Sequence, residues 1–176
     1  MTSNLRITRA WAMPDRYTFR IPQIGGIIGE YLKAGEVWAD PFCGRYSPAT
    51  LTNDADEDNP ATYHLDGLDF LKSLADKSVD GVLFDPPYSV EQALRKYIPS
   101  HNGTAGRSEY HYRCMDEIGR IIKDGGCAIC FNWNSNGIGM NRGFALIQIL
   151  LIAHGACHND TIVTVERKLP TTGILI

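Results

Sequence analysis

The sequence lacks a strong charge of either sign, a long apolar run and a leader segment. Its formal net charge over 176 residues is −3, so no overall basic field attracts nucleic acid, and such binding needs a local patch. No apolar run reaches the roughly 20 residues that a membrane span requires. The first residues do not join a positive charge to an apolar stretch, as a secretion signal does. These absences predict a soluble, cytoplasmic protein without a membrane partner.

A framework of paired cysteines is also missing. The five cysteines are odd in number and scattered, which favours a reduced compartment over a disulfide scaffold. Cys127 and Cys130 form a CxxC motif, but the surrounding "GGCAICF" predicts a buried strand, and a second pair of metal ligands is missing. We therefore expect these thiols to pack as small apolar groups.

Composition and periodicity predict one α/β domain over residues 1–176. Apolar residues make up 44% and charged residues 21%, which is ordinary for a globular chain of a length that buries one core. Predicted helices cover residues 22–34, 67–75 and 113–124, the last stopped by two glycines. Predicted strands cover residues 35–40, 49–56, 62–65, 79–85, 127–133 and 161–168, while 141–155 fits one helix or a short helix passing into a strand. This alternation favours a parallel sheet.

Polar residues stand at the ends of four predicted strands. They are Asp40, Asn53 with Asp54, Asp85, and the run from Asn132 to Ser135. In open α/β sheets, ligands bind beyond the carboxyl ends of the strands, where the loops converge. Four such endings indicate the rim of a binding site.

The most specific ending is Asp85-Pro86-Pro87-Tyr88. Two successive prolines donate no backbone hydrogen bond, so this edge offers acceptors only, the Asp85 carboxylate and nearby carbonyls. Such an edge beside an aromatic ring suits a flat ligand with an exocyclic amino group, on which Tyr88 stacks. The alternative is a proline-rich turn with a surface tyrosine.

These residues resemble a known family, the amino-type S-adenosylmethionine-dependent DNA methyltransferases that act on adenine N6 or cytosine N4. The family's DPPY-type catalytic tetrapeptide matches residues 85–88 in full, and its cofactor motif DPFxGxG matches at residues 40–44. The family's acidic position after the second strand falls on Asn53-Asp54, and its D-A-x-x-F-L element falls on residues 66–71. Its N-terminal cofactor segment resembles "TFRIPQI", and its late strand hairpin resembles residues 142–168.

The resemblance implies a Rossmann-like methyltransferase fold with an antiparallel last strand, S-adenosylmethionine as cofactor and no metal. Implied cofactor-binding residues are Phe19, Ile21, Asp40, Pro41, Phe42, Cys43, Gly44, Asn53, Asp54, Asp66 and Gly67, and implied catalytic residues are Asp85, Pro86, Pro87 and Tyr88. Either Asp54 or Asn53 accepts from the ribose hydroxyls. Asp66 accepts from the adenine amino group or, alternatively, caps a helix.

The implied reaction is methyl transfer to adenine N6 in DNA by a site-specific methyltransferase. Cytosine N4, an RNA amino group and a non-catalytic cofactor-binding subunit stay open as alternatives. Asn132, Trp133 and Ser135 follow a strand at the site face and are candidates to line the base pocket.

Two features depart from the family pattern. The second glycine of the cofactor motif is missing, and only six residues separate Gly44 from Leu51. A crossover with its helix needs at least about 10–12 residues, so we expect that helix to be absent. The chain also has no room for a separate target-recognition domain.

The remaining candidate for substrate binding is the segment 89–113, which we expect to be a long loop because it shows no sustained period. Arg95, Lys96, Tyr97 and Arg107 combine groups that hold phosphates and stack on bases. A solvated loop with ordinary charges is the alternative. DNA contact through a second copy of the chain or a partner protein is a further hypothesis.

Overall fold

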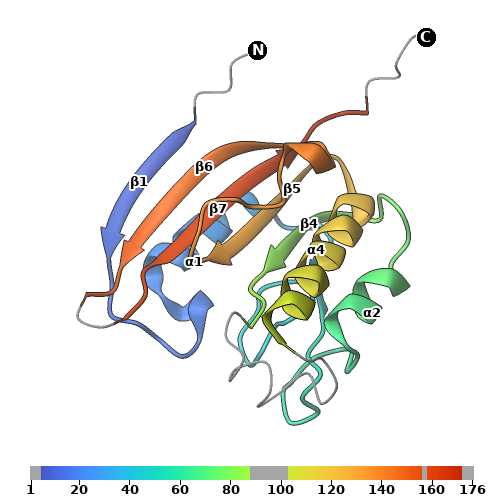
Figure 1. The fold of residues 1–176 in the computed structure, drawn as a ribbon, viewed down its shortest axis with the longest axis horizontal. Helices are drawn as coiled ribbons and strands as arrows, with labels where there is room; N and C mark the ends of the chain where they lie inside the picture. Colours follow the sequence, from blue (N-terminus) through green and yellow to red (C-terminus); the bar gives the residue numbers. More distant parts are fainter. Residues whose placement is uncertain (1–4, 88–102, 156–157, 172–176) are drawn as a thin grey trace.

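The computed structural model describes residues 5–87, 103–155 and 158–171, and at 103–108 it describes the backbone only. Within these ranges seven strands form one sheet in the order β1-β6-β7-β5-β4-β2-β3 (Figure 1). The strands are β1 (Arg6–Trp11), β2 (Trp38–Asp40), β3 (Leu51–Thr52), β4 (Val79–Phe84), β5 (Ile122–Asn132), β6 (Phe144–Ala153) and β7 (Thr161–Lys168). β7 runs antiparallel to β5 and β6, and the other neighbours are parallel. The predicted mostly parallel sheet with an antiparallel last strand is confirmed.

Helices cover both faces of this sheet. They are α1 (Pro22–Tyr31), α2 (Gly67–Ser73) and α4 (Gly103–Ile121), with 3-10 turns η1 (Thr18–Arg20) and η2 (Met140–Arg142). In Figure 1, α1 lies behind the sheet and α2 and α4 lie in front of it. Alternate side chains of a strand point to opposite faces, so Val82 and Phe84 of β4 pack with α2 and α4, and Leu83 packs with α1. The strand that leads to Asp85 is therefore anchored on both sides.

The same alternation decides the role of the CxxC motif. Cys127 packs in the core behind the sheet, whereas Cys130 packs in the core in front of it. The two thiols point away from each other and cannot share a metal ion. Both are buried and free, as expected for small apolar side chains.

The carboxyl ends of β2, β3 and β4 meet at one edge of the sheet. Ala39 of β2 pairs in parallel with Leu51 of β3 on one side and with Val82 of β4 on the other. Between β2 and β3, residues 41–50 form turns and no helix. The predicted absence of the crossover helix is therefore confirmed.

Two predictions about loops and strands were wrong. Residues 103–113 of the expected loop belong to α4, because Tyr110 and Cys114 pack against the front core and tertiary packing overrides the weak helix propensity of glycine. The expected strand at 62–65 is reduced to one bridge between Asn53 and Tyr63. The N–H groups of Thr62 and Tyr63 both donate to the same carbonyl of Thr52, so no ladder continues.

The end of α4 also differs from the prediction. The helix stops at Ile121 and passes directly into β5, so the glycines expected at its stop lie within the strand. The buried ammonium of Lys168 donates to the carbonyls of Gly119 and Ile122. A lysine distant in the sequence thus satisfies carbonyls that a glycine cap otherwise serves.

β6 and β1 complete the sheet on the side of β7 that faces away from β5. For residues 141–155, predicted as one helix or as a short helix passing into a strand, the second alternative holds, because the 3-10 turn η2 leads into β6. β1 was not predicted, because five of its six residues are exposed and show no apolar alternation. It joins β6 through backbone pairing that runs from Arg6 with Gln148 to Trp11 with Ala153.

Candidate active site

The first side chain of the site is Asp85, directly after β4. It accepts a hydrogen bond from the hydroxyl of Thr18 in η1. A small part of Asp85 still reaches solvent, yet burial raises the pKa of its carboxyl to about 6, against the lowering effect of the Thr18 hydrogen bond. Pro86 is buried and Pro87 half-buried beside it. Tyr88, the last residue of the predicted tetrapeptide, lies outside the described residues.

Asp40 lies at the same edge, at the end of β2. Its carboxylate accepts from the N–H of Phe42 at 3.0 Å and from the hydroxyl of Ser47 at 2.6 Å. Burial raises the pKa of this carboxyl to about 7, and the nearby charges of Asp85 and Asp54 add to the effect, while the two hydrogen bonds oppose it. Two residues of the short connection after β2, Phe42 and Ser47, therefore bind the same buried carboxylate.

The two candidates for the ribose contact have different surroundings. Asn53 donates from Nδ2 to the carbonyls of Pro41 and Leu65, each at 3.0 Å, and its Oδ1 accepts from the N–H of Leu65 at 2.9 Å. Asp54 accepts from the N–H of Gly44 at 2.9 Å. The amide of Asn53 is occupied by the protein itself, whereas a carboxylate has about four acceptor positions. The ribose contact therefore stays a prediction for Asp54.

The cofactor motif after Asp40 is a compact turn. Phe42 and Cys43 are buried, and Gly44 has φ +54°, which favours glycine. The ring of Phe42 lies against Gly67, where an added Cβ would meet ring carbons at 2.5 Å. Burial raises the pKa of the Cys43 thiol to about 12, so this thiol stays neutral and acts as a packing group.

Asp66 is the N-cap of α2. Its Oδ1 accepts from the N–H of Leu68 at 2.9 Å, and the hydroxyl of Tyr110 donates to Oδ2 at 3.0 Å. Burial raises the pKa of the Tyr110 hydroxyl, so this group is a permanent donor. The capping alternative for Asp66 is confirmed, and its contact to a cofactor adenine stays a prediction.

The segment "TFRIPQI" reaches the site mainly through Thr18, which sequence reasoning did not single out. Phe19 packs its ring against Phe131, with centroids 5.0 Å apart. Ile21 is buried in the core as the residue before α1. The signal for Thr18 was its place inside this segment, but no local pattern tells which of its residues turns toward Asp85.

The candidates for the base pocket lie at the end of β5. Asn132 is half-buried, while Trp133 and Ser135 are exposed. The loop that follows is held by Glu166 of β7, which accepts from the N–H groups of Ile138 and Gly139. Glu166 is 2% exposed and was missed, because a glutamate in an alternating strand resembles a solvent-facing residue.

The predicted basic and aromatic residues of 89–113 are placed only in part. Arg107 lies in α4, where the structure describes only its backbone. Arg95, Lys96 and Tyr97 lie outside the described residues. Their proposed contact with substrate stays a prediction.

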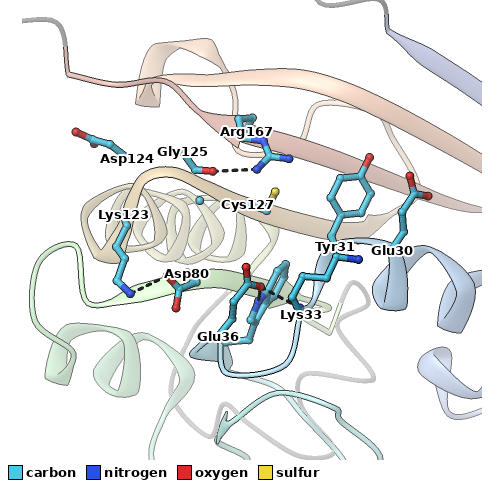
Figure 2. Close-up of a pocket in the computed structure, with 12 residues that line it drawn as sticks. Glu30, Tyr31, Lys33, Glu36, Asp80, Lys123, Asp124, Gly125, Cys127 and Arg167 are labelled. Atoms are coloured by element: carbon cyan, nitrogen blue, oxygen red, sulfur yellow. Dashed lines mark hydrogen bonds and ion pairs between the residues drawn. The ribbon is translucent and has the colours of Figure 1, made fainter.

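A pocket of about 410 Å³ lies at the opposite edge of the sheet from Asp40 and Asp85, where Trp38 begins β2 (Figure 2). Its charged side chains are already paired: Lys123 lies 2.7 Å from Asp80, and Arg167 donates to the carbonyl of Gly125 at 3.0 Å. Ligands of open α/β sheets bind at the other edge. We assign this pocket no part in the reaction.

Comparison with known structures identifies the architecture. The structure of TrmN from Thermus thermophilus matches with a TM-score of 0.54 and 16% identity, over 85% of this chain and 49% of that chain. The candidate methyltransferase SMU.1697c from Streptococcus mutans, in complex with SAH, matches with a TM-score of 0.52 and 12% identity, over 89% and 100% of the chains. The fold is that of the S-adenosylmethionine-dependent methyltransferases. The predicted fold class is thereby confirmed.

Sequence comparison adds one curated relative. The type II methyltransferase M.BamHI of Bacillus amyloliquefaciens is 29% identical over 76 residues, which cover 42% of this chain and 18% of the relative. The chain thus spans less than a fifth of the length of M.BamHI and about half of TrmN. The chain matches no protein-family profile.

Two searches of the described residues bear on other kinds of site. No helix among them is long and apolar enough to cross a membrane. They also contain no group of three or more His, Cys, Asp or Glu side chains placed to hold a metal ion.

Proposed function

We propose that this chain transfers the methyl group of S-adenosylmethionine to an exocyclic amino group of a nucleic-acid base, with adenine N6 as the target. The observation that carries the proposal is Asp85-Pro86-Pro87 at the carboxyl end of β4, beside the buried carboxylate of Asp40. The 76-residue match to a type II methyltransferase supports the choice of a nucleic-acid base.

The residues at this edge fit the cofactor electrostatically. Asp40, Asp54 and Asp85 bring three carboxylates together, and among the described residues no Lys or Arg forms an ion pair with Asp40 or Asp85. Burial raises the pKa values of Asp40 and Asp85, so a cation placed beside them would stabilise their ionised forms. A sulfonium and an ammonium group would supply that charge. The cofactor, when bound, provides the activated methyl group.

Asp85 and the carbonyl of Pro86 would each accept one hydrogen of the substrate amino group. The nitrogen lone pair of such an amine is delocalised into the ring, and two hydrogen bonds to acceptors localise it for in-line attack. Asp85 is ionised at neutral pH, because its pKa of about 6 lies below 7. It then accepts the proton that the nitrogen loses after methyl transfer, directly or through water.

Tyr88 completes the proposed pocket as the stacking surface for the base. A base in a duplex must leave the stack to reach Asp85, and an aromatic ring replaces part of the lost stacking energy. Asn132 and Trp133 at the end of β5 are proposed to contact the same base. The physical argument requires a planar amine, so cytosine N4 and an RNA amino group remain alternative targets, and a non-catalytic cofactor-binding subunit remains the third.

The proposal is tested by incubating the purified protein with methyl-labelled cofactor and unmethylated DNA or RNA, followed by digestion to nucleosides. We expect labelled N6-methyladenine from DNA, lost by more than about 100-fold in Asp85→Ala. The control Asp69→Ala removes an exposed carboxylate of α2 and keeps the activity. Labelled N4-methylcytosine or methylated RNA supports the alternative targets. Cofactor binding without transfer overturns the catalytic proposal.

A further inference from the structure

Five side chains beside the site form an arginine–tyrosine cluster, made of Arg16, Tyr17, Arg20, Arg45 and Tyr46. The rings of Tyr17 and Tyr46 meet edge to face with centroids 4.7 Å apart. The guanidinium of Arg16 lies 4.5 Å from the centroid of Tyr17, and that of Arg20 lies 5.4 Å from the centroid of Tyr46. The three arginines are exposed, and Tyr46 is 49% exposed. Two segments of the chain thus build one surface of cations and aromatic faces.

The arginines of the cluster lack ion-pair partners in the part of the chain that the structure describes. Among the described residues, none of them has a carboxylate within 4.0 Å. The neighbouring Asp15 accepts from the backbone N–H of Tyr17. Most other described cations are paired, as in Lys77–Asp124, Arg120–Asp76 and Arg142–Asp116. In a chain of net charge −3, this is a local concentration of free positive charge.

The cluster is tied to the catalytic edge by two hydrogen bonds. Thr18, between Tyr17 and Arg20 in the chain, donates to Asp85. Ser47, directly after Tyr46, donates to Asp40 at 2.6 Å. Both segments that carry the cluster are therefore fixed to the carboxylates of the proposed site. A polymer held by the cluster lies next to that site.

A groove of about 520 Å³ continues from the cluster along α1. Arg20, Arg45 and Tyr46 line it together with Ile28 of α1 and Leu32, the residue after α1. Cations next to aromatic and apolar walls match a nucleic-acid strand, whose phosphates need positive charge and whose bases stack on rings.

We propose that the arginine–tyrosine cluster binds the phosphodiester backbone and a flanking base of the nucleic-acid substrate, on the α1 side of the catalytic edge. The proposal rests on the function proposed above and adds to it a surface outside the segment 89–113. Each phosphate contact made by an arginine releases condensed counterions, so binding depends on salt concentration.

The test measures binding of the full chain to a fluorescent single-stranded oligonucleotide by anisotropy, without cofactor, between about 50 and 200 mM salt. The variant Arg16→Ala/Arg20→Ala/Arg45→Ala removes the three charges. The control Arg9→Ala removes an exposed arginine of β1 that forms no ion pair with a described residue. Because all four side chains are exposed, we expect unchanged melting temperatures.

We expect the triple variant to bind at least about tenfold more weakly at low salt, and its log–log salt slope to fall by about 2, that is, three contacts at roughly 0.7 each. The triple Arg→Lys variant should recover most of the slope, and Tyr46→Leu should weaken binding of oligonucleotides but not of heparin. Parental affinity and slope in the triple variant overturn the proposal, as does equal loss in Arg9→Ala. An Asp85→Ala variant that binds normally but transfers no methyl group separates this surface from the proposed chemistry.

Discussion

The hydroxyl of Thr18 donates a hydrogen bond to the carboxylate of Asp85, and this bond joins η1 to the end of β4. A hydrogen bond to the ionised form lowers the pKa of a carboxyl group, whereas burial raises it. Burial is the larger effect here and leaves the pKa at about 6. The hydrogen bond from Thr18 therefore favours the ionised form of Asp85, against the effect of its burial.

The first prediction concerns the pH dependence of methyl transfer. A protonated Asp85 carboxyl is a weaker hydrogen-bond acceptor, and it cannot take the proton that the substrate nitrogen loses. We therefore expect kcat/KM to fall as the pH drops through about 6. Thr18→Val removes the hydrogen bond and should move this midpoint upward, while Thr18→Ser should restore it. The measurement is a pH–rate profile of each variant. A midpoint that is unchanged in Thr18→Val would contradict the assigned role.

The second prediction concerns stability and Asp40. The folded pKa of about 7 lies above the unfolded value near 3.9, so the unfolded chain loses this proton first as the pH rises. The free energy of unfolding should therefore fall between about pH 4 and pH 7, by at most about 1.4 kcal/mol per pH unit for this group, and then level off. Asp85 contributes the same trend up to about pH 6.

Urea unfolding at a series of pH values checks this expectation. Asp40→Asn should remove the slope between about pH 6 and pH 7, because the amide does not ionise. Ser47→Ala removes a hydrogen bond that lowers the pKa of Asp40, so its slope should extend to higher pH. A cationic cofactor favours both ionised carboxylates, and its affinity should rise over the same range.

The third prediction concerns the close contact between Phe42 and Gly67. A Cβ at Gly67 would stand 2.5 Å from the ring, so Gly67→Ala should displace Phe42, destabilise the fold by about 1–3 kcal/mol and weaken cofactor binding. The matched control is Gly29→Ala in α1, where an added Cβ meets nothing within 4 Å. That substitution should stabilise the helix by about 0.5–1 kcal/mol. Unfolding curves and calorimetric titration with cofactor measure both effects.

The fourth prediction concerns Glu166 under the loop after β5. Glu166→Ala leaves the N–H groups of Ile138 and Gly139 without their acceptor, which should cost about 2–3 kcal/mol. Arg167→Ala, its exposed neighbour, should change stability by less than about 0.5 kcal/mol. If the loop positions Trp133, the Glu166→Ala variant should also lose substrate affinity while cofactor affinity stays the same. Equal stability of the two variants would show that Glu166 does not hold the loop.

The strand ends could be predicted because each apolar run stops at a polar residue. Asp40 and Asp85 follow such runs, and parallel pairing brings any such residues to one edge. The absent crossover helix followed from chain length alone. What could not be predicted depends on distant partners. Asn53 binds the backbone of Leu65, and Lys168 binds the carbonyls of Gly119 and Ile122 where α4 passes into β5.

The arginine–tyrosine cluster also could not be predicted from the sequence, because its residues come from distant segments. Its arginines are separated in the sequence by up to 29 positions, and no local period links Arg16 with Arg45. The ring contact between Tyr17 and Tyr46 and the two hydrogen bonds to Asp40 and Asp85 bring them to one surface. By contrast, the basic and aromatic residues of 89–113 lie within one segment of the sequence, and their contact with substrate stays a prediction.

The place of β1 in the sheet sets an order of events during synthesis. Arg6 pairs with Gln148, 142 residues further along the chain, so β1 has no neighbour until β6 has left the ribosome. At about 5–20 residues per second this interval is roughly 7–30 s. Throughout it, Ile7 and Trp11 have no strand beside them, and the core around β2, β4 and β5 can close first. β1 is therefore made before the other strands of this sheet and is among the last of them to be paired.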